Sequence, residues 1–160
     1  MTNLGNLLKY LLENKVNFVL IGGFAGVVHG SSLVTKDLDI CALLSEEDVE
    51  NFRKILGPLH PKHRMTPQKL SFLENPKGPQ NMNNLYLDTD YGILDILTEV
   101  KGVGGFVEIS KKAESIQLFG YPCKLISLDD LIRAKKAMDR DKDKLALREL
   151  NLIKDKRKKS

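Results

Sequence analysis

One stretch near the start of the chain constrains the fold most: a short apolar run, two adjacent glycines, a spacer and then two acids. The run at 17–21 is almost wholly apolar, Gly22 and Gly23 follow directly, and a second run covers 37–44. Short, nearly continuous apolar runs are typical of strands that are buried within a sheet. We therefore expect a strand, a glycine turn, a short helix and a second strand, in that order.

The second strand carries two acids, Asp37 and Asp39. Successive strand side chains point to opposite faces, so these two share one face, with Cα atoms about 6–7 Å apart. Two such carboxylates repel each other and are costly beside apolar neighbours unless a cation joins them. Mg²⁺, a hard ion that takes oxygen ligands and shares them with phosphates, is the simplest candidate.

The glycine pair has two interpretations. Gly22 and Gly23 permit a sharp turn and let a ligand approach the backbone. A helix that begins near Phe24 would point its free N–H groups at the same spot, which favours an anion such as phosphate. An ordinary tight turn without a ligand explains the two glycines equally well.

A third acid is suggested by its surroundings. Two strands are expected at 84–88 and 92–98, and Asp95 is the only charged residue of the apolar run 93–97. Burying a lone carboxylate costs several kcal/mol unless something compensates it. Asp95 is therefore the best third ligand, and three carboxylates suit two magnesium ions that serve a nucleoside triphosphate.

Other elements follow from periodicity and capping residues. Helices are expected at 3–14, after Ser45 up to Gly57, after Ser127, and at 142–154, with a hairpin at 113–118 and 121–126. Lys135 falls on the apolar stripe of the helix after Ser127. It either extends its amine along the surface to water or holds a phosphate.

Residues 57–84 differ in composition from the rest of the chain. They contain five of the six prolines and six His, Lys or Arg residues against one acid. Long segments of this kind are usually functional or disordered. We interpret this one as a flexible insertion that forms a mobile, mildly basic flap beside the site, with a short helix from Thr66 to Phe72. A surface loop without function is an equal alternative.

Length and charge limit the remaining classes. The 160 residues suit one domain, 1–160, of the α/β (α+β) class, with a mixed β-sheet, packed helices and C-terminal helices at 127–155. The net charge of +4 resides in the basic tail 154–160, so the rest of the chain is neutral and lacks a broad nucleic-acid-binding charge. No apolar run is long enough for a membrane span and no basic secretory leader begins the chain, so a cytoplasmic location is expected. Cys41 and Cys123 are expected to be buried thiols.

The combined pattern resembles the DNA polymerase β-like nucleotidyltransferase superfamily. The resemblance rests on Gly22-Gly23, on Thr35-Lys36-Asp37-Leu38-Asp39 and on Asp95 in a later strand. The runs 29–39 and 127–143 look especially like the minimal bacterial and archaeal members related to the toxins of toxin–antitoxin pairs. The family pattern implies a nucleotidyltransferase fold and transfer of a nucleoside monophosphate from a nucleoside triphosphate, such as ATP, to a hydroxyl.

The resemblance also implies roles for individual residues. Gly22 and Gly23 would face the phosphates, Asp37 and Asp39 would bind both metal ions, and Asp95 would bind one. Two further residues, Lys135 and Lys142, match basic positions near the nucleotide. Similar small members often have an arginine where this chain has Leu33, and a serine where it has Gly23.

Two functions from different classes remain open at this point. The first is an active nucleotidyltransferase whose acceptor is an RNA or protein hydroxyl, for which all three acids are present. The second is a non-catalytic protein that binds nucleotide or a partner, such as one half of a toxin–antitoxin pair with a small helical protein. Leu33 and the neutral body of the chain motivate the second.

Overall fold

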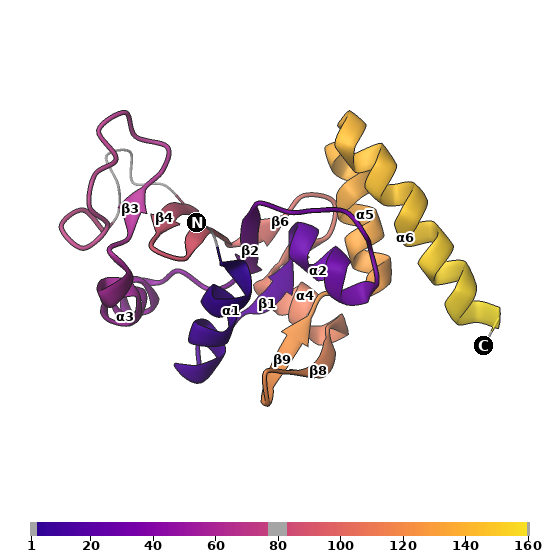
Figure 1. The fold of residues 1–160 in the computed structure, drawn as a ribbon, viewed down its shortest axis with the longest axis horizontal. Helices are drawn as coiled ribbons and strands as arrows, with labels where there is room; N and C mark the ends of the chain where they lie inside the picture. Colours follow the sequence, from indigo (N-terminus) through magenta and orange to yellow (C-terminus); the bar gives the residue numbers. More distant parts are fainter. Residues whose placement is uncertain (1–2, 77–82, 160) are drawn as a thin grey trace.

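The protein was analysed as a computed structural model, which describes residues 3–76 and 83–159. A mixed sheet with strand order β3-β4-β5-β2-β1-β9-β8 runs through the molecule (Figure 1). Its strands are β1 (Val19–Ile21), β2 (Asp37–Cys41), β3 (Lys62–His63), β4 (Leu85–Thr89), β5 (Gly92–Leu97), β8 (Glu114–Leu118) and β9 (Tyr121–Leu125). A separate two-residue ladder joins β6 (Glu99–Val100) to β7 (Gly104–Gly105). The expected α/β class with a mixed sheet is confirmed.

The centre of the sheet brings sequence-distant strands together. β1 pairs antiparallel with β2, and β2 pairs parallel with β5. In this register Asp39 lies opposite Ile21 on one side and opposite Asp95 on the other. Because side chains alternate along a strand, the acids of β2 and β5 share one face of the sheet.

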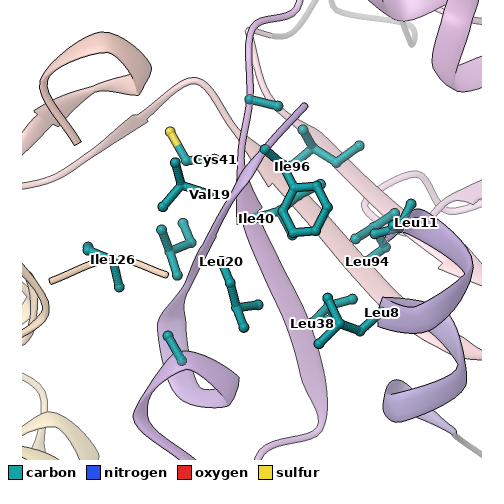
Figure 2. Packing of buried hydrophobic residues seen from close by; sticks show 14 of the residues in the cluster. Leu8, Leu11, Val19, Leu20, Leu38, Ile40, Cys41, Leu94, Ile96 and Ile126 are labelled. Atoms are coloured by element: carbon teal, nitrogen blue, oxygen red, sulfur yellow. The ribbon is translucent and has the colours of Figure 1, made fainter. Parts of the chain in front are cut away.

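The opposite face of the sheet carries the main apolar core. Leu38, Ile40 and Leu94 are fully buried there, and Leu8 and Leu11 of helix α1 (Leu4–Glu13) pack against that layer (Figure 2). The regular leucine spacing of α1 turns one stripe toward the sheet, and Asn3 caps the helix by accepting a hydrogen bond from the Asn6 amide at 3.0 Å. The core therefore holds β2 and β5 in a fixed register below the acids.

Further helices surround the sheet: α2 (Gly22–His29), α3 (Glu46–Leu56), α4 (Phe106–Lys112), α5 (Leu128–Met138) and α6 (Asp141–Lys159). The expected capping box of α3 is present, since Ser45 and Asp48 bond to each other's backbone amides. Ser127 caps α5 through the Asp130 amide. Helix α6 continues five residues beyond the expected end and includes the basic tail up to Lys159, whereas Ser160 lies outside the described residues.

Two expected element boundaries were wrong, and one helix was missed. α2 begins at Gly22 rather than near Phe24, because the chain turns at Gly22 itself, where φ is +70°. β2 ends at Cys41 rather than at 44. Helix α4 was not expected, since the glycine-rich stretch before it hides a short element with only two buried side chains, Phe106 and Ile109.

The segment 57–84 contributes more to the fold than a surface loop would. It begins with a 3-10 turn, η1 (Gly57–Leu59), and β3 extends the sheet beside β4. Phe72 within it is fully buried. The helix expected from Thr66 to Phe72 is wrong: the Thr66 hydroxyl accepts from the Leu70 amide and Lys69 has φ +46°, which makes a turn. Residues 77–82 of the expected flap lie outside the described residues.

In the described part of the chain, no helix is both long and apolar enough to cross a membrane. Cys41 and Cys123 are buried free thiols, as expected.

Candidate functional site

Three carboxylates predicted from separate parts of the sequence lie together on one face of the sheet. Asp37 and Asp39 come from β2 and Asp95 from the neighbouring β5, with Asp39 and Asp95 in register. One carboxylate oxygen from each of the three lies within 4.8 Å of the others. Hard divalent cations take oxygen ligands, so this set of donors fits Mg²⁺ or Mn²⁺.

The backbone of Gly22 forms the wall beside Asp39. Gly22 has φ +70°, a region that side-chain-bearing residues rarely adopt. A Cβ at this position would come within 2.8 Å of the Asp39 Cβ. Gly22 is therefore required both for the turn and for the space that the Asp39 carboxylate occupies.

The acids are held in a costly electrostatic arrangement. Burial raises the pKa of Asp39 to about 7, and the neighbouring charges of Asp95 and Asp37 add to this effect. Burial also raises the pKa of Asp95, although a hydrogen bond from Arg64 and its charge act in the opposite direction. A divalent cation among these carboxylates would relieve both the burial cost and the repulsion, which is the second observation that fits a metal ion here.

Arg64 is a site residue that sequence reasoning missed. Its Nη2 donates to both oxygens of Asp95, at 2.6 and 2.8 Å. It lies just after β3 in the proline-rich segment, and its own amide donates to the Tyr86 carbonyl of β4 at 2.8 Å. The only signal in the sequence was the excess of basic residues in 57–84.

A pocket of about 360 Å³ opens beside Asp37 and Asp39. Its lining residues come from the start of α2, the loop before β2 and the helices α5 and α6: Gly22, Gly23, Gly26, Ser31, Leu33, Val34, Thr35, Lys36, Asp37, Asp39, Lys135, Arg140, Lys142, Asp143, Ala146 and Leu150. All of the phosphate-binding residues suggested by the sequence, Gly22, Gly23, Lys135 and Lys142, are therefore at this pocket. Their roles stay predictions.

Gly23 has a packing reason of its own. A Cβ on Gly23 would lie 2.9 Å from the Thr35 Oγ1. The Thr35 hydroxyl donates to the Asp37 carbonyl at 3.0 Å and so fixes the entry into β2. A serine at position 23 would displace this hydroxyl, so the glycine fits the neighbouring loop.

The basic side of the pocket is organised by a buried acid, Asp143. Arg140 donates from Nε and Nη2 to Asp143 at 2.6 and 3.2 Å, and Lys135 Nζ lies 3.6 Å from the same carboxylate. Although burial acts to raise the pKa of Asp143, the hydrogen bonds and charge of Arg140 and the charge of Lys135 hold it below its usual value. Lys135 is thus neither fully extended to water nor unpaired: Asp143 orients it toward the pocket.

The loop that carries Leu33 is fastened to α6. The Glu149 carboxylate accepts from the Ser32 amide and hydroxyl, both at 2.7 Å, and from the Ser31 hydroxyl at 3.3 Å. Leu33 lines the pocket. Before this loop, His29 ends α2 with its Nε2 2.7 Å from the Ile126 carbonyl, and it is absent from the pocket lining.

Comparison with solved structures finds seven matching chains, and two of them align along nearly the whole chain as follows. The lincosamide antibiotic adenylyltransferase LnuA, crystallised with lincomycin, aligns with a TM-score of 0.59 at 17% identity, covering 94% of this chain and 95% of that chain. A candidate nucleotidyltransferase from Thermotoga maritima aligns with a TM-score of 0.59 at 18% identity, covering 92% and 93%. No family model and no curated protein sequence matches the chain. At these identities the likeness establishes the nucleotidyltransferase fold.

Proposed function

We propose that this protein is a metal-dependent nucleotidyltransferase that transfers a nucleoside monophosphate from a nucleoside triphosphate to a hydroxyl of RNA or protein. The observation that carries the proposal is the convergence of Asp37, Asp39 and Asp95 beside the N-terminus of α2. The nucleotidyltransferase fold of the two solved structures supports it.

The outer phosphates of the nucleotide would be bound on the helical side of the three carboxylates. The free N–H groups at the start of α2, together with Lys135, Arg140 and Lys142, would bind the β- and γ-phosphates in the pocket. Asp143 would hold the side chains of Lys135 and Arg140 in place. Val34, which is largely exposed at the pocket rim, and Leu33 offer an apolar surface beside this path.

The three carboxylates would hold two Mg²⁺ ions, which when bound supply Lewis-acid activation of the attacking hydroxyl and neutralise the leaving pyrophosphate. In the reaction the acceptor oxygen bonds to the α-phosphorus as the bond from that phosphorus to the α–β bridging oxygen breaks. Asp95 would also accept the hydroxyl proton. Pyrophosphate leaves along the basic side of the pocket.

An RNA or protein acceptor is proposed from the sequence resemblance. The similar lincosamide adenylyltransferase structure adds lincosamides to the acceptors that should be assayed. We therefore propose incubation with each radiolabelled nucleoside triphosphate, Mg²⁺, and RNA, a protein extract or a lincosamide as acceptor. Asp39→Ala is the inactive control. No label transfer by the wild-type protein with any combination, or equal transfer by Asp39→Ala, would contradict the proposal.

The proposed role of Lys142 in phosphate binding has a separate test with a matched control. Lys142 and Lys144 are both exposed residues of α6, but only Lys142 lines the pocket. We expect Lys142→Ala to weaken nucleotide binding, measured by calorimetry, by about three- to tenfold, as for the loss of one charge-assisted contact. Lys144→Ala should leave the affinity unchanged.

We also propose a cytoplasmic location, and a relation to toxin–antitoxin nucleotidyltransferases with a small helical partner. Both rest on the sequence. Co-purification of such a partner without any metal-dependent turnover would favour the non-catalytic alternative.

A further inference from the structure

The guanidinium of Arg64 binds Asp95, the third carboxylate of the cluster, through a single nitrogen. One nitrogen, Nη2, bonds both oxygens of Asp95 at once, at 2.6 and 2.8 Å. A nitrogen bonded to both oxygens lies between them, which is where a cation chelated by both oxygens would also lie. The guanidinium and a divalent cation would therefore compete for the same lone pairs, and their charges would repel each other.

The position of Arg64 is fixed by more than this ion pair. Its amide donates to the Tyr86 carbonyl, and its guanidinium carbon lies 5.7 Å from the centroid of the Tyr86 ring. A guanidinium over an aromatic ring is attracted to the ring face, which adds to the ion pair with Asp95. The Arg64 Nε is buried and has no hydrogen-bond partner among the residues that the structure describes.

The basic side chains on the two sides of the three acids have different partners. On the helical side, Lys135 and Arg140 are both paired with the buried Asp143. On the strand side, Arg64 directs its charge at Asp95, inside the cluster of three carboxylates. Within residues 3–76 and 83–159, Arg64 is thus the cation whose hydrogen-bonded partner is itself one of the three clustered acids.

We propose that Arg64 is a built-in substitute for a divalent cation at Asp95: it keeps this carboxylate occupied in the free protein and must give up at least one Asp95 oxygen before a cation bridges Asp95 to Asp37 and Asp39. The inference deepens the proposed function, since it rests on the same carboxylates as ligands. It assigns Arg64 as a positioning residue that sets the affinity of the site for cations.

The test measures cation binding on the full chain, without nucleotide. Mn²⁺ affinity is determined by calorimetry and by the electron paramagnetic resonance signal of free Mn²⁺ for the wild type, Arg64→Gln and Arg64→Lys. We expect Arg64→Gln to bind Mn²⁺ at least about tenfold more tightly, because a competing charge in contact with the site is gone. Arg64→Lys, which keeps the charge, should stay within about threefold of the wild type.

A second variant ties the effect to one carboxylate. In an Asp95→Asn background, Arg64→Gln should no longer raise Mn²⁺ affinity, because the contested ligand is absent. Thermal unfolding checks that each variant is folded, and Arg64→Met, which keeps apolar contact with Tyr86, replaces the glutamine variant if that one unfolds. Unchanged or weaker Mn²⁺ binding by the charge-removing variant, or no Mn²⁺ binding at all, would overturn the inference.

The outcome is separate from the fate of the proposed reaction. Tighter Mn²⁺ binding by Arg64→Gln together with no label transfer by the wild type would sustain the role of Arg64 and contradict the nucleotidyltransferase proposal. Label transfer by the wild type together with unchanged Mn²⁺ binding by Arg64→Gln would do the reverse.

Discussion

The charge of Asp39 should make the metal-free protein measurably less stable above neutral pH. Burial and the two neighbouring acids raise its pKa from 3.8 to about 7. A group whose pKa is raised by folding contributes stability that is complete below its unfolded value and is lost as the pH rises to its folded value. The contribution of Asp39 should therefore disappear between about pH 4 and 7.

The magnitude follows from the same values. At about 1.4 kcal/mol per pH unit, the interval from 3.8 to about 7 corresponds to about 4 kcal/mol. Water in the open pocket screens part of the charge, so we expect Asp39→Asn to raise the free energy of unfolding by about 2 to 4 kcal/mol at pH 8. The difference should shrink steadily as the pH falls below 7 and vanish only below about pH 3.8, where Asp39 is protonated in both the folded and the unfolded wild type.

The assay is urea unfolding followed by circular dichroism at several pH values in the presence of a chelator. Asp155→Asn makes the same chemical change at an exposed position of α6 and should have no effect. Adding Mn²⁺ at pH 8 should stabilise the wild type and leave Asp39→Asn almost unchanged. Equal stabilities of the wild type and Asp39→Asn at both pH 5 and pH 8 would refute the reasoning.

Three further changes have expected outcomes. Gly22→Ala should destabilise the protein by roughly 2 kcal/mol or more in thermal unfolding, since it combines a positive φ with a steric clash, whereas Gly120→Ala, with φ +82° but open space around it, should cost only about 1 kcal/mol. Asp143→Asn should lower stability by about 3 kcal/mol and raise the KM for nucleotide more than it lowers kcat, because two pocket cations lose their buried partner. Glu149→Gln should speed hydrogen exchange at the Ser32 amide by about tenfold or more, and unchanged exchange would show that the loop is held by other contacts.

Residues with a local signature could be placed from the sequence. The alternation of β2 put Asp37 and Asp39 on one face, and the isolation of Asp95 among apolar residues marked it as their partner; the structure brings all three together. Ser45 and Asp48 satisfied a spacing rule that needs only one helical turn, and their capping box is present. In these cases the determining contacts are local or follow from strand register.

Residues whose partners lie far along the chain could not be placed in the same way. Arg64 belongs to a segment without periodicity, and its contact with Asp95 depends on how β3 and β4 pair. No sequence pattern singled out Asp143, which is 1% exposed and pairs with Lys135 and Arg140. Such pairings depend on tertiary packing, which secondary-structure propensity and hydrophobic periodicity do not predict.

The hydrogen bonds from Ser31 and Ser32 to Glu149 have a consequence for folding during synthesis. The two sides of the pocket are 117 residues apart in sequence, and helix α6 leaves the ribosome after every strand has emerged. Contacts of such long range form late, once the intervening chain has folded. A nascent chain can therefore complete its sheet and bring its three carboxylates together while the pocket beside them still lacks one wall, so the proposed nucleotide binding should appear only when α6 docks.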